Sequence, residues 1–257
     1  MAIGQIPQSL QYFLRARDVL PFVGAGVSRA VKARGTTTPL FPSWQELLLA
    51  AAEKLVEEGK PAEAKLVRAL LEVSPPDYLQ SAERAAQAFG KPLFARLLKG
   101  YFDRNEAEAE PASLELARII WRLGSKLVVT TNYDKVLEWT SANSDSWDIE
   151  APFEQISSLQ HDVPRSTVWH LHGRITNVEN CILTPEGYAR LYGEKRLFTA
   201  ALETLRVHIA KKHLIFIGFS LDDPYIEQTL REVNAIFHGY GGPHYILIKE
   251  DEVVRLQ

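Results

Sequence analysis

Small or polar residues with chemical potential stand directly after four short apolar runs of this sequence. The first run is followed by Gly24-Ala25-Gly26, the second by Asn132, the third by His172-Gly173 and the fourth by Gly218. Glycines let backbone amides approach a phosphate, an amide side chain orients a hydroxyl or a water, and an imidazole exchanges a proton near neutral pH. These residue types suit proton transfer on a phosphate-bearing ligand.

The apolar runs before these residues predict strands. They are rich in β-formers and are separated by helical patterns rather than hairpin turns, as is typical of a parallel sheet buried on both faces. We therefore expect an α/β fold, a Rossmann-like parallel sheet with helices on both faces. Ligands bind outside the carboxyl ends of such strands, so the four clusters should share one crevice. The expected strands are Val19–Val23, Leu127–Thr131, Val168–Leu171, Leu214–Ile217 and Tyr245–Ile248.

The interval between the first two strands is far longer than one crossover helix requires. Apolar residues recur in it at helical spacing, and breaks rich in Gly and Pro separate the segments. We interpret residues 39–123 as a helical module inserted after the first strand of one domain spanning residues 1–257. The expected helices of this module are Trp44–Glu57, Ala62–Glu72, Tyr78–Phe89, Pro92–Phe102 and Ser113–Leu123.

After Asn132 the sequence again alternates between expected helices and expected strands. We expect a helix over Tyr133–Ser141 and an irregular polar stretch that continues to Ser166. Three more helices are expected further along the chain, at Pro185–Tyr192, Arg196–Lys211 and Pro224–Phe237.

The composition is that of a folded, water-soluble protein, with 46% hydrophobic and 24% charged residues. A net charge of −3 gives no general attraction to nucleic acid or to anionic lipid, so we expect neither as a partner. Cys181 is the single cysteine, which excludes an intramolecular disulfide and a zinc site of several thiolates. We see no signal peptide or membrane span and expect a reducing, cytoplasmic setting.

Each candidate residue also has a structural interpretation. Gly24–Gly26 would then form a tight turn only, and Ser28 would cap the following helix. Asn132 would be an N-cap, and Asp134 a first-turn acid that favours the helix dipole. His170, two residues before His172, is expected to be a core histidine with its hydrogen bonds satisfied.

Taken in order, the motifs resemble those of sirtuins and of prokaryotic sirtuin-like domains. The resemblance spans nearly the whole chain and is carried by an ordered set rather than by any single piece. The main motifs are Gly24-Ala-Gly-x-Ser28, Thr131-Asn-Tyr-Asp134, His172-Gly173 and Gly218-x-Ser220, with Pro42-Ser-Trp44, Leu183-Thr184 through Tyr188, and Asp222-Asp223-Pro224 in support.

The resemblance implies NAD as the substrate and Asn132 and His172 as the catalytic residues. Asn132 would hold a ribose hydroxyl or the attacking water, and His172 would accept a proton. The remaining NAD contacts that it implies are Gly24, Ala25, Gly26 and Ser28 at the phosphates, Asp134 at the nicotinamide ribose, and Gly218 and Ser220 at the adenosine half.

Two departures separate this chain from protein-deacylating sirtuins. Those proteins usually have four zinc-binding cysteines, whereas this chain has only Cys181, and the usual Gly-Ile-Pro-x-Phe-Arg continuation after Ser28 is absent. The resemblance therefore points to the sirtuin-like NAD hydrolases of bacterial anti-phage defence, which need no metal and would release nicotinamide and ADP-ribose. Activation by self-assembly or by a protein partner follows from that analogy.

Two alternatives stay open. One is an NAD-dependent protein deacylase, and the other is a module that binds NAD or ADP-ribose without turnover. His172→Ala or Asn132→Ala is expected to lower NAD cleavage at least about 10²-fold if the hydrolase interpretation holds. Gly26→Val is expected to block the approach of backbone amides to the pyrophosphate.

Overall fold

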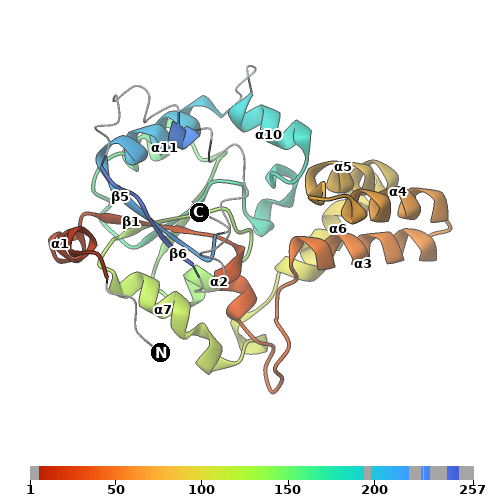
Figure 1. The fold of residues 1–257 in the computed structure, drawn as a ribbon, viewed down its shortest axis with the longest axis horizontal. Coiled ribbons are helices and arrows are strands. Elements are labelled where there is room, and N and C mark those ends of the chain that lie inside the picture. Colours follow the sequence, from red (N-terminus) through yellow and green to blue (C-terminus); the bar gives the residue numbers. More distant parts are fainter. Residues whose placement is uncertain (1–5, 194–197, 220–226, 228, 232–241, 249–257) are drawn as a thin grey trace.

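The fold centres on one parallel sheet, seen in a computed structural model that describes residues 6–193, 198–219, 227, 229–231 and 242–248. Its six strands follow the order β3-β4-β2-β1-β5-β6, and every pair is parallel (Figure 1). The expected α/β fold is thereby confirmed. The strands are β1 (Val19–Val23), β2 (Leu127–Thr130), β3 (Asp145–Asp148), β4 (Thr167–His170), β5 (His213–Ile217) and β6 (Tyr245–Leu247).

Successive side chains of each buried strand point to opposite sides of the sheet. Because both sets are apolar, helices cover both faces of the sheet. On β1, Phe22 packs in one hydrophobic cluster and Val23 in another. The Phe22 cluster contains residues of α9, α10 and α11, and the Val23 cluster contains residues of α2, α7 and α8. In Figure 1, α11 lies on one side of the sheet and α7 on the other. These helices are α2 (Ala25–Ala30), α7 (Glu115–Arg122), α8 (Val136–Trp139), α9 (Phe153–Ser158), α10 (Pro185–Tyr192) and α11 (Thr199–Lys211).

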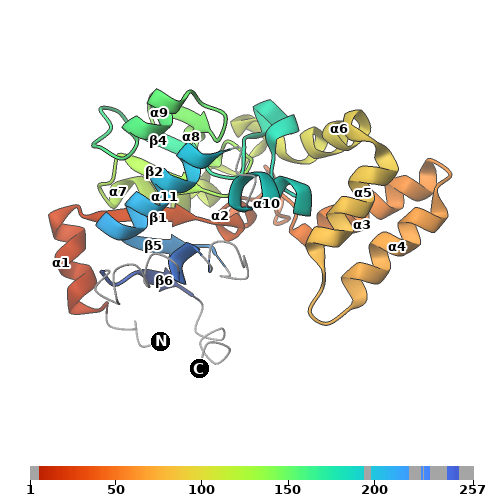
Figure 2. The ribbon, with the colours of Figure 1, turned by 90° about the horizontal axis from the view of Figure 1, so that it is seen from above.

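Four further helices form a body beside the sheet (Figures 1 and 2). They are amphipathic, and α3 begins with a capping box in which Ser43 and Glu46 exchange hydrogen bonds. Their apolar faces share a cluster that includes Leu55, Val67 and Ala85. The helix α7, in contrast, packs with sheet residues. The four helices are α3 (Trp44–Glu57), α4 (Pro61–Glu72), α5 (Tyr78–Phe89) and α6 (Lys91–Phe102), and the boundaries 39–123 of the inserted module stay a prediction.

The main error of the sequence interpretation lies between Ser141 and Ser166. The polar stretch expected there contains β3 and α9. The strand was missed because it lies at the sheet edge, pairs on one side only and is mostly half-buried, so it lacks an apolar run. The helix expected over Tyr133–Ser141 is limited to the four residues of α8.

Two other findings concern the chain ends. The helix α1 (Gln8–Ala16) was not anticipated; it lies near the start of β5, where Phe13 stacks on His213 at 3.4 Å between ring centroids. The expected helix Pro224–Phe237 lies almost wholly outside the described residues.

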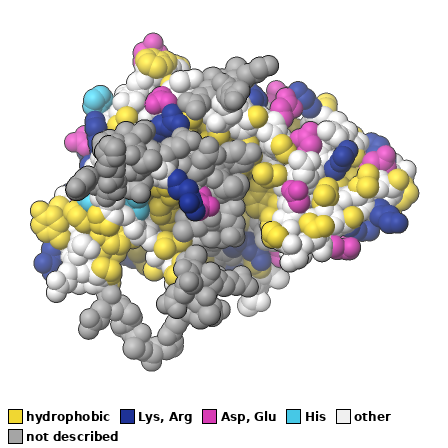
Figure 3. Space-filling view, turned by 45° about the horizontal axis from the view of Figure 1, so that its top comes forward, with side chains coloured by type: hydrophobic (Ala, Val, Ile, Leu, Met, Phe, Trp, Pro, Cys, Tyr) yellow, Lys and Arg dark blue, Asp and Glu magenta, His cyan; other side chains and the backbone are white. Residues whose placement is uncertain are grey.

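Within the described part of the chain, no helix is long and apolar enough to cross a membrane. On the face in Figure 3, basic and acidic side chains are interspersed.

Candidate functional site

The order of the strands predicts where a ligand would bind. From β1 the chain continues to β2 on one side of it, and later returns to β5 on the other side. Such a change of direction is the switch point at which open α/β sheets bind ligands, outside the carboxyl ends of the strands. The turns after β1, β2 and β5 therefore frame the candidate site.

Backbone hydrogen bonds join these three turns. The Gly24 N–H donates to the Ile217 carbonyl at 3.0 Å, and the Gly26 N–H donates to the Gly218 carbonyl at 2.8 Å. On the other side, the Thr131 N–H donates to the Val23 carbonyl at 3.2 Å. The turns after β1, β2 and β5 thus form one continuous edge, and the crevice that the sequence predicts for all four clusters stays a prediction.

Close packing explains the glycines of this edge. A Cβ added to Gly26 would lie 2.8 Å from the Gly218 Cα, and one added to Gly218 would lie 2.6 Å from the Val27 nitrogen. Gly218 also has a φ of +65°, which disfavours any other residue. The interpretation as a tight structural turn therefore has a geometric basis. Gly26→Val would collide with the neighbouring turn, so it cannot isolate a phosphate contact, which stays a prediction.

Asn132 is held rigidly in this edge, with 9% of its surface exposed. Its Nδ2 donates to the Gly24 carbonyl at 3.0 Å and to the Ser28 Oγ at 2.9 Å, while its backbone N–H donates to the Thr130 Oγ1. The N-cap interpretation is wrong, since α8 starts at Val136 and its N-cap residue is not Asn132. Among the described residues, the Oδ1 atom has no hydrogen-bond partner. An oriented amide with a free acceptor results.

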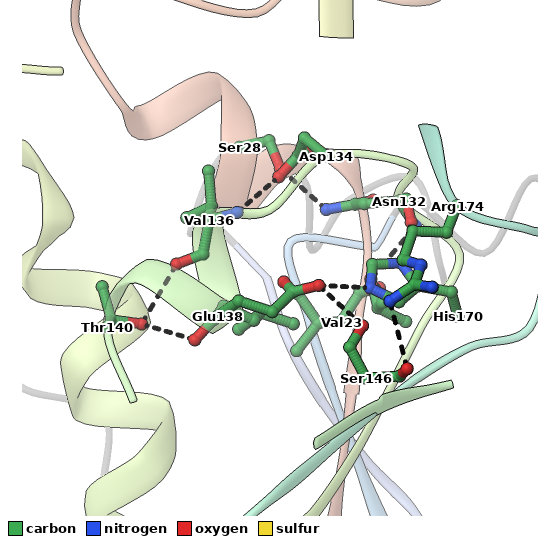
Figure 4. Close-up of polar contacts among 12 residues, drawn as sticks. Val23, Ser28, Asn132, Asp134, Val136, Glu138, Thr140, Ser146, His170 and Arg174 are labelled. Carbon is green, nitrogen blue, oxygen red and sulfur yellow. Dashed lines mark hydrogen bonds and ion pairs between the residues drawn. The ribbon is translucent and has the colours of Figure 1, made fainter. Parts of the chain in front are cut away.

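Ser28 and Asp134 extend this arrangement (Figure 4). The Ser28 hydroxyl donates to Asp134 Oδ2 at 2.7 Å, and the second oxygen, Oδ1, accepts from the Val136 N–H at 3.1 Å. Ser28 lies inside α2 and caps no helix, so that alternative is wrong. Asp134 accepts the N–H of Val136, the first residue of α8, so its structural interpretation as an acid at a helix start is partly right. Burial raises the pKa of the Asp134 carboxyl, although the hydrogen bonds from Ser28 and Val136 oppose this.

His172 lies just beyond the end of β4 and is 2% exposed. Its Nε2 shares a hydrogen bond of 2.9 Å with the hydroxyl of Tyr192, and its ring meets Tyr188 edge-on at 5.2 Å between centroids. Both tyrosines belong to α10. The sequence interpretation gave Tyr192 no role, and only its position in the segment after the histidine could have suggested one.

His170 and Glu138 form a buried pair beneath Asn132. The His170 Nδ1 lies 2.8 Å from the Asn132 carbonyl oxygen, and its Nε2 lies 2.9 Å from Glu138 Oε1. Burial alone would lower the pKa of His170, but the Glu138 charge and the hydrogen bonds outweigh it and raise the pKa. Burial alone would raise the pKa of Glu138, but the His170 charge and the hydrogen bonds from His170 and Ser146 together outweigh it and lower the pKa. His170 is thus a satisfied core histidine, as expected, and Glu138 was overlooked.

The structure therefore brings most of the predicted site residues into one hydrogen-bonded edge. His172 follows the neighbouring strand β4 and contacts α10 instead. Ala25 is exposed at the start of α2, and Ser220 and the segment Asp222-Asp223-Pro224 lie outside the described residues. The residues joined in the edge are Gly24, Gly26, Ser28, Asn132, Asp134 and Gly218.

Metal ligands do not gather in the part of the chain that is described: no group of three or more His, Cys, Asp or Glu side chains there could hold an ion. Cys181 is half-buried, and burial raises the pKa of its thiol far above the ordinary value. A neutral thiol is a poor metal ligand and nucleophile. We find no role for Cys181 at the site.

Comparison with known proteins places these observations in a family. Residues 126–257 match the family model of the SIR2-like domain. NAD(+) hydrolase ThsA of Cytobacillus dafuensis is 25% identical over 233 residues, covering 89% of this chain and 40% of that protein. NAD(+) hydrolase ThsA of Enterococcus faecium is 25% identical over 134 residues, covering 52% of this chain and 27% of that protein.

The uncharacterized protein y4cA of Sinorhizobium fredii is 27% identical over 249 residues, covering 87% of this chain and 18% of that protein. The chain thus spans between 18% and 40% of the length of these three relatives. The family match covers just over half of the sequence and includes Asn132, His172 and Gly218. This chain belongs to the SIR2-like domain family.

Proposed function

We propose that this protein is an NAD glycohydrolase, which cleaves the nicotinamide–ribose bond of NAD with water to give nicotinamide and ADP-ribose. The observation that carries the proposal is the oriented Asn132 amide in a glycine-rich edge at the switch point of the sheet, with His172 beyond the adjacent strand. The similarity to relatives named NAD(+) hydrolases supports it.

The chemistry demands positioning more than a strong acid. Nicotinamide leaves the ribose C1′ as a neutral molecule that takes the electron pair of the broken C–N bond, so positive charge develops on the sugar. Water then forms the new C–O bond at C1′ and loses a proton. A site that fixes the sugar and the water and accepts that proton supplies most of the required stabilisation.

Asn132 is assigned to orientation. Both hydrogens of its Nδ2 are engaged by Gly24 and Ser28, so the side chain cannot rotate without breaking two buried hydrogen bonds. Its Oδ1 then accepts a hydrogen bond from a ribose hydroxyl or from the attacking water. Asp134 holds Ser28 in turn and fixes this arrangement at the nicotinamide ribose.

His172 is assigned as the proton acceptor. The hydroxyl of Tyr192 and the edge of Tyr188 fix its ring, so the imidazole has one orientation available. Among ordinary side chains, an imidazole is the one that exchanges a proton near neutral pH.

The remaining substrate contacts follow the edge. The backbone of Gly24, Ala25 and Gly26 is assigned to the NAD phosphates, and Gly218 and Ser220 to the adenosine half. Because the Ser28 hydroxyl is engaged by Asn132 and Asp134, we assign its influence on the phosphates to the shape of the turn. No step of this scheme uses a metal ion.

We further propose that the activity depletes NAD in bacterial anti-phage defence, in the cytoplasm, and that self-assembly or a protein partner activates it. The segment that carries sirtuin-like motifs is only part of the length of the relatives, which leaves room for such control in a longer protein.

The test is nicotinamide release from NAD by purified protein, over a range of protein concentrations and with or without an acyl-lysine peptide. His172→Ala and Asn132→Ala are expected to lower release at least about 10²-fold while circular dichroism shows a folded protein. His161→Ala, at an exposed histidine, is the matched control and should keep wild-type turnover.

Three outcomes separate the candidate functions. Release in water that both site variants abolish supports the hydrolase. Release that depends strictly on the acyl-lysine peptide would restore the deacylase. NAD binding by calorimetry without release, at every protein concentration, would favour the non-catalytic module.

A further inference from the structure

The strongest unexplained feature of the site is the buried pair beneath Asn132. His170 is fully buried at the carboxyl end of β4, and its two ring nitrogens face two acceptors: the Asn132 carbonyl oxygen at 2.8 Å and Glu138 Oε1 at 2.9 Å (Figure 4). A carbonyl only accepts, and so does an ionised carboxylate. With Glu138 ionised, both nitrogens of His170 must therefore carry protons.

Other groups around the pair favour this state. The Ser146 hydroxyl donates to the same Glu138 oxygen at 2.8 Å, and the charge of Asp134 adds to that of Glu138 in favouring a protonated ring. Glu138 Oε2 is buried and has no hydrogen-bond partner in the described part of the chain. His170 is consequently the main compensation for burying this carboxylate.

We propose that His170 is a positioning residue of the active site: its Nδ1–H, kept protonated by the partner Glu138, fixes the peptide unit after Asn132 and thereby the Asn132 amide. This inference rests on the hydrolase proposed above. His170 itself touches no substrate, since it is fully buried.

The hydrogen bonds of Asn132 show why this contact matters. Thr130 Oγ1 holds the Asn132 N–H, and Gly24 and Ser28 hold its side chain, but among the described residues only His170 holds its carbonyl oxygen. Without that bond the peptide unit can rotate, and the amide loses its fixed direction. Because the glycine turns that would bind the phosphates are untouched, NAD binding should suffer less than turnover.

Two double variants isolate the Nδ1–H contact. Both carry Glu138→Gln, so neither leaves an unpaired buried carboxylate. The first adds His170→Asn, whose amide Nδ2 replaces the Nδ1–H donor, and the second adds His170→Leu, which is of similar size but has no donor. The pair therefore differs in the hydrogen bond to the Asn132 carbonyl and little else.

We expect the His170→Asn double variant to keep kcat within about fivefold of wild type, because the donor is restored. The His170→Leu double variant should lose kcat by about tenfold or more, with KM for NAD changed by less than about threefold. Hydrogen–deuterium exchange should also rise in residues 131–135 of the Leu variant, relative to the Asn variant. Equal kcat and equal exchange in the two variants would overturn the proposal.

Two further measurements keep the test decisive. If the wild-type protein releases no nicotinamide at any protein concentration, the hydrolase proposal fails, while the exchange comparison still judges the positioning role. If a double variant does not fold, ¹⁵N NMR of the His170 ring in the wild-type protein decides at neutral pH. Slowly exchanging protons on both nitrogens support the proposal, and an unprotonated Nδ1 overturns it.

Discussion

Ser28→Ala is the substitution with the most informative expected effect, because one hydroxyl connects two candidate site residues. The Ser28 Oγ–H donates to the buried Asp134 carboxyl at 2.7 Å and accepts from the Asn132 Nδ2 at 2.9 Å. Alanine removes both bonds and little volume. The Asn132 amide then keeps only its bond to the Gly24 carbonyl.

The expected magnitude follows from these two bonds. A hydrogen bond to a charged group contributes about 1.5–3 kcal/mol, and a buried donor left without an acceptor costs about 1–3 kcal/mol. Asn132 is 9% exposed, so water can replace part of the second term. We therefore expect Ser28→Ala to lower the free energy of unfolding by about 3 kcal/mol when Asp134 is ionised.

The loss should depend on pH. Burial raises the folded pKa of Asp134, and the hydrogen bond from Ser28 lowers it. Removing that hydrogen bond therefore raises the folded pKa further. A raised folded pKa gives stability that is fully present below the unfolded pKa and is lost as pH rises through the folded pKa. The difference between variant and wild type should therefore grow as pH rises through the folded pKa of Asp134 and shrink as pH falls toward the ordinary value of 3.8.

Urea unfolding across this pH range tests the reasoning. Ser81→Ala is the matched control, because Ser81 is fully buried and donates to the neutral Val67 carbonyl at 3.1 Å. It should lose about 1 kcal/mol at every pH. A loss by Ser28→Ala that is equally small, or that is independent of pH, would refute the role assigned to the hydroxyl.

Three other predictions concern packing, a buried histidine and metal content. Gly218→Ala should lose about 3 kcal/mol in urea unfolding, because of its φ of +65° and the 2.6 Å approach to the Val27 nitrogen; Gly59→Ala, at φ +74° with open space, should lose about 1 kcal/mol. Equal losses would refute the close-packing argument. Burial lowers the pKa of His208 to about 4, so its contribution to stability is present above pH 6.5 and is lost as pH falls toward 4. This contribution of His208 to the free energy of unfolding is about 3 kcal/mol. In acid unfolding, the wild-type protein should lose it and His208→Gln should not. The same dependence of stability on pH in both proteins would contradict this prediction. Mass spectrometry of metals should find no stoichiometric zinc, since Cys181 is the only thiol; one zinc per chain would refute this.

The fold was largely predictable where strands are buried. The strands β1, β2 and β4 are fully buried and β5 is mostly buried, and their apolar residues are visible in the sequence. The edge strand β3 reads Asp145-Ser-Trp-Asp148, and its half-buried side chains obey no apolar pattern. Its partner, β4, was visible, but pairing with an edge strand is a long-range property.

The sequence predicted which residue types of the candidate site stand at the strand ends. It did not predict which of those residues contact one another. Gly26 requires a small residue because Gly218 packs against it, and Ser28 reaches Asp134 across 106 positions of sequence. Local patterns allowed a capping role for Ser28 and favoured one for Asn132, and the observed helix boundaries exclude both. Glu138 gave no signal at all, because a single carboxylate on a short helix is usually exposed to solvent.

The segment Asn132-Tyr-Asp134 also explains why the helical module is not an independent attachment. Asn132 and Asp134 bond to the turn after β1, whereas Tyr133, between them, packs in the cluster that contains Leu55 and meets Phe102 of α6 at 5.6 Å between ring centroids. The turn after β2 thus contacts both the sheet edge and the helical body. Removing the module would expose the Tyr133 side chain, which is 8% exposed in the intact protein. The helices therefore pack against the same short segment that carries Asn132 and Asp134.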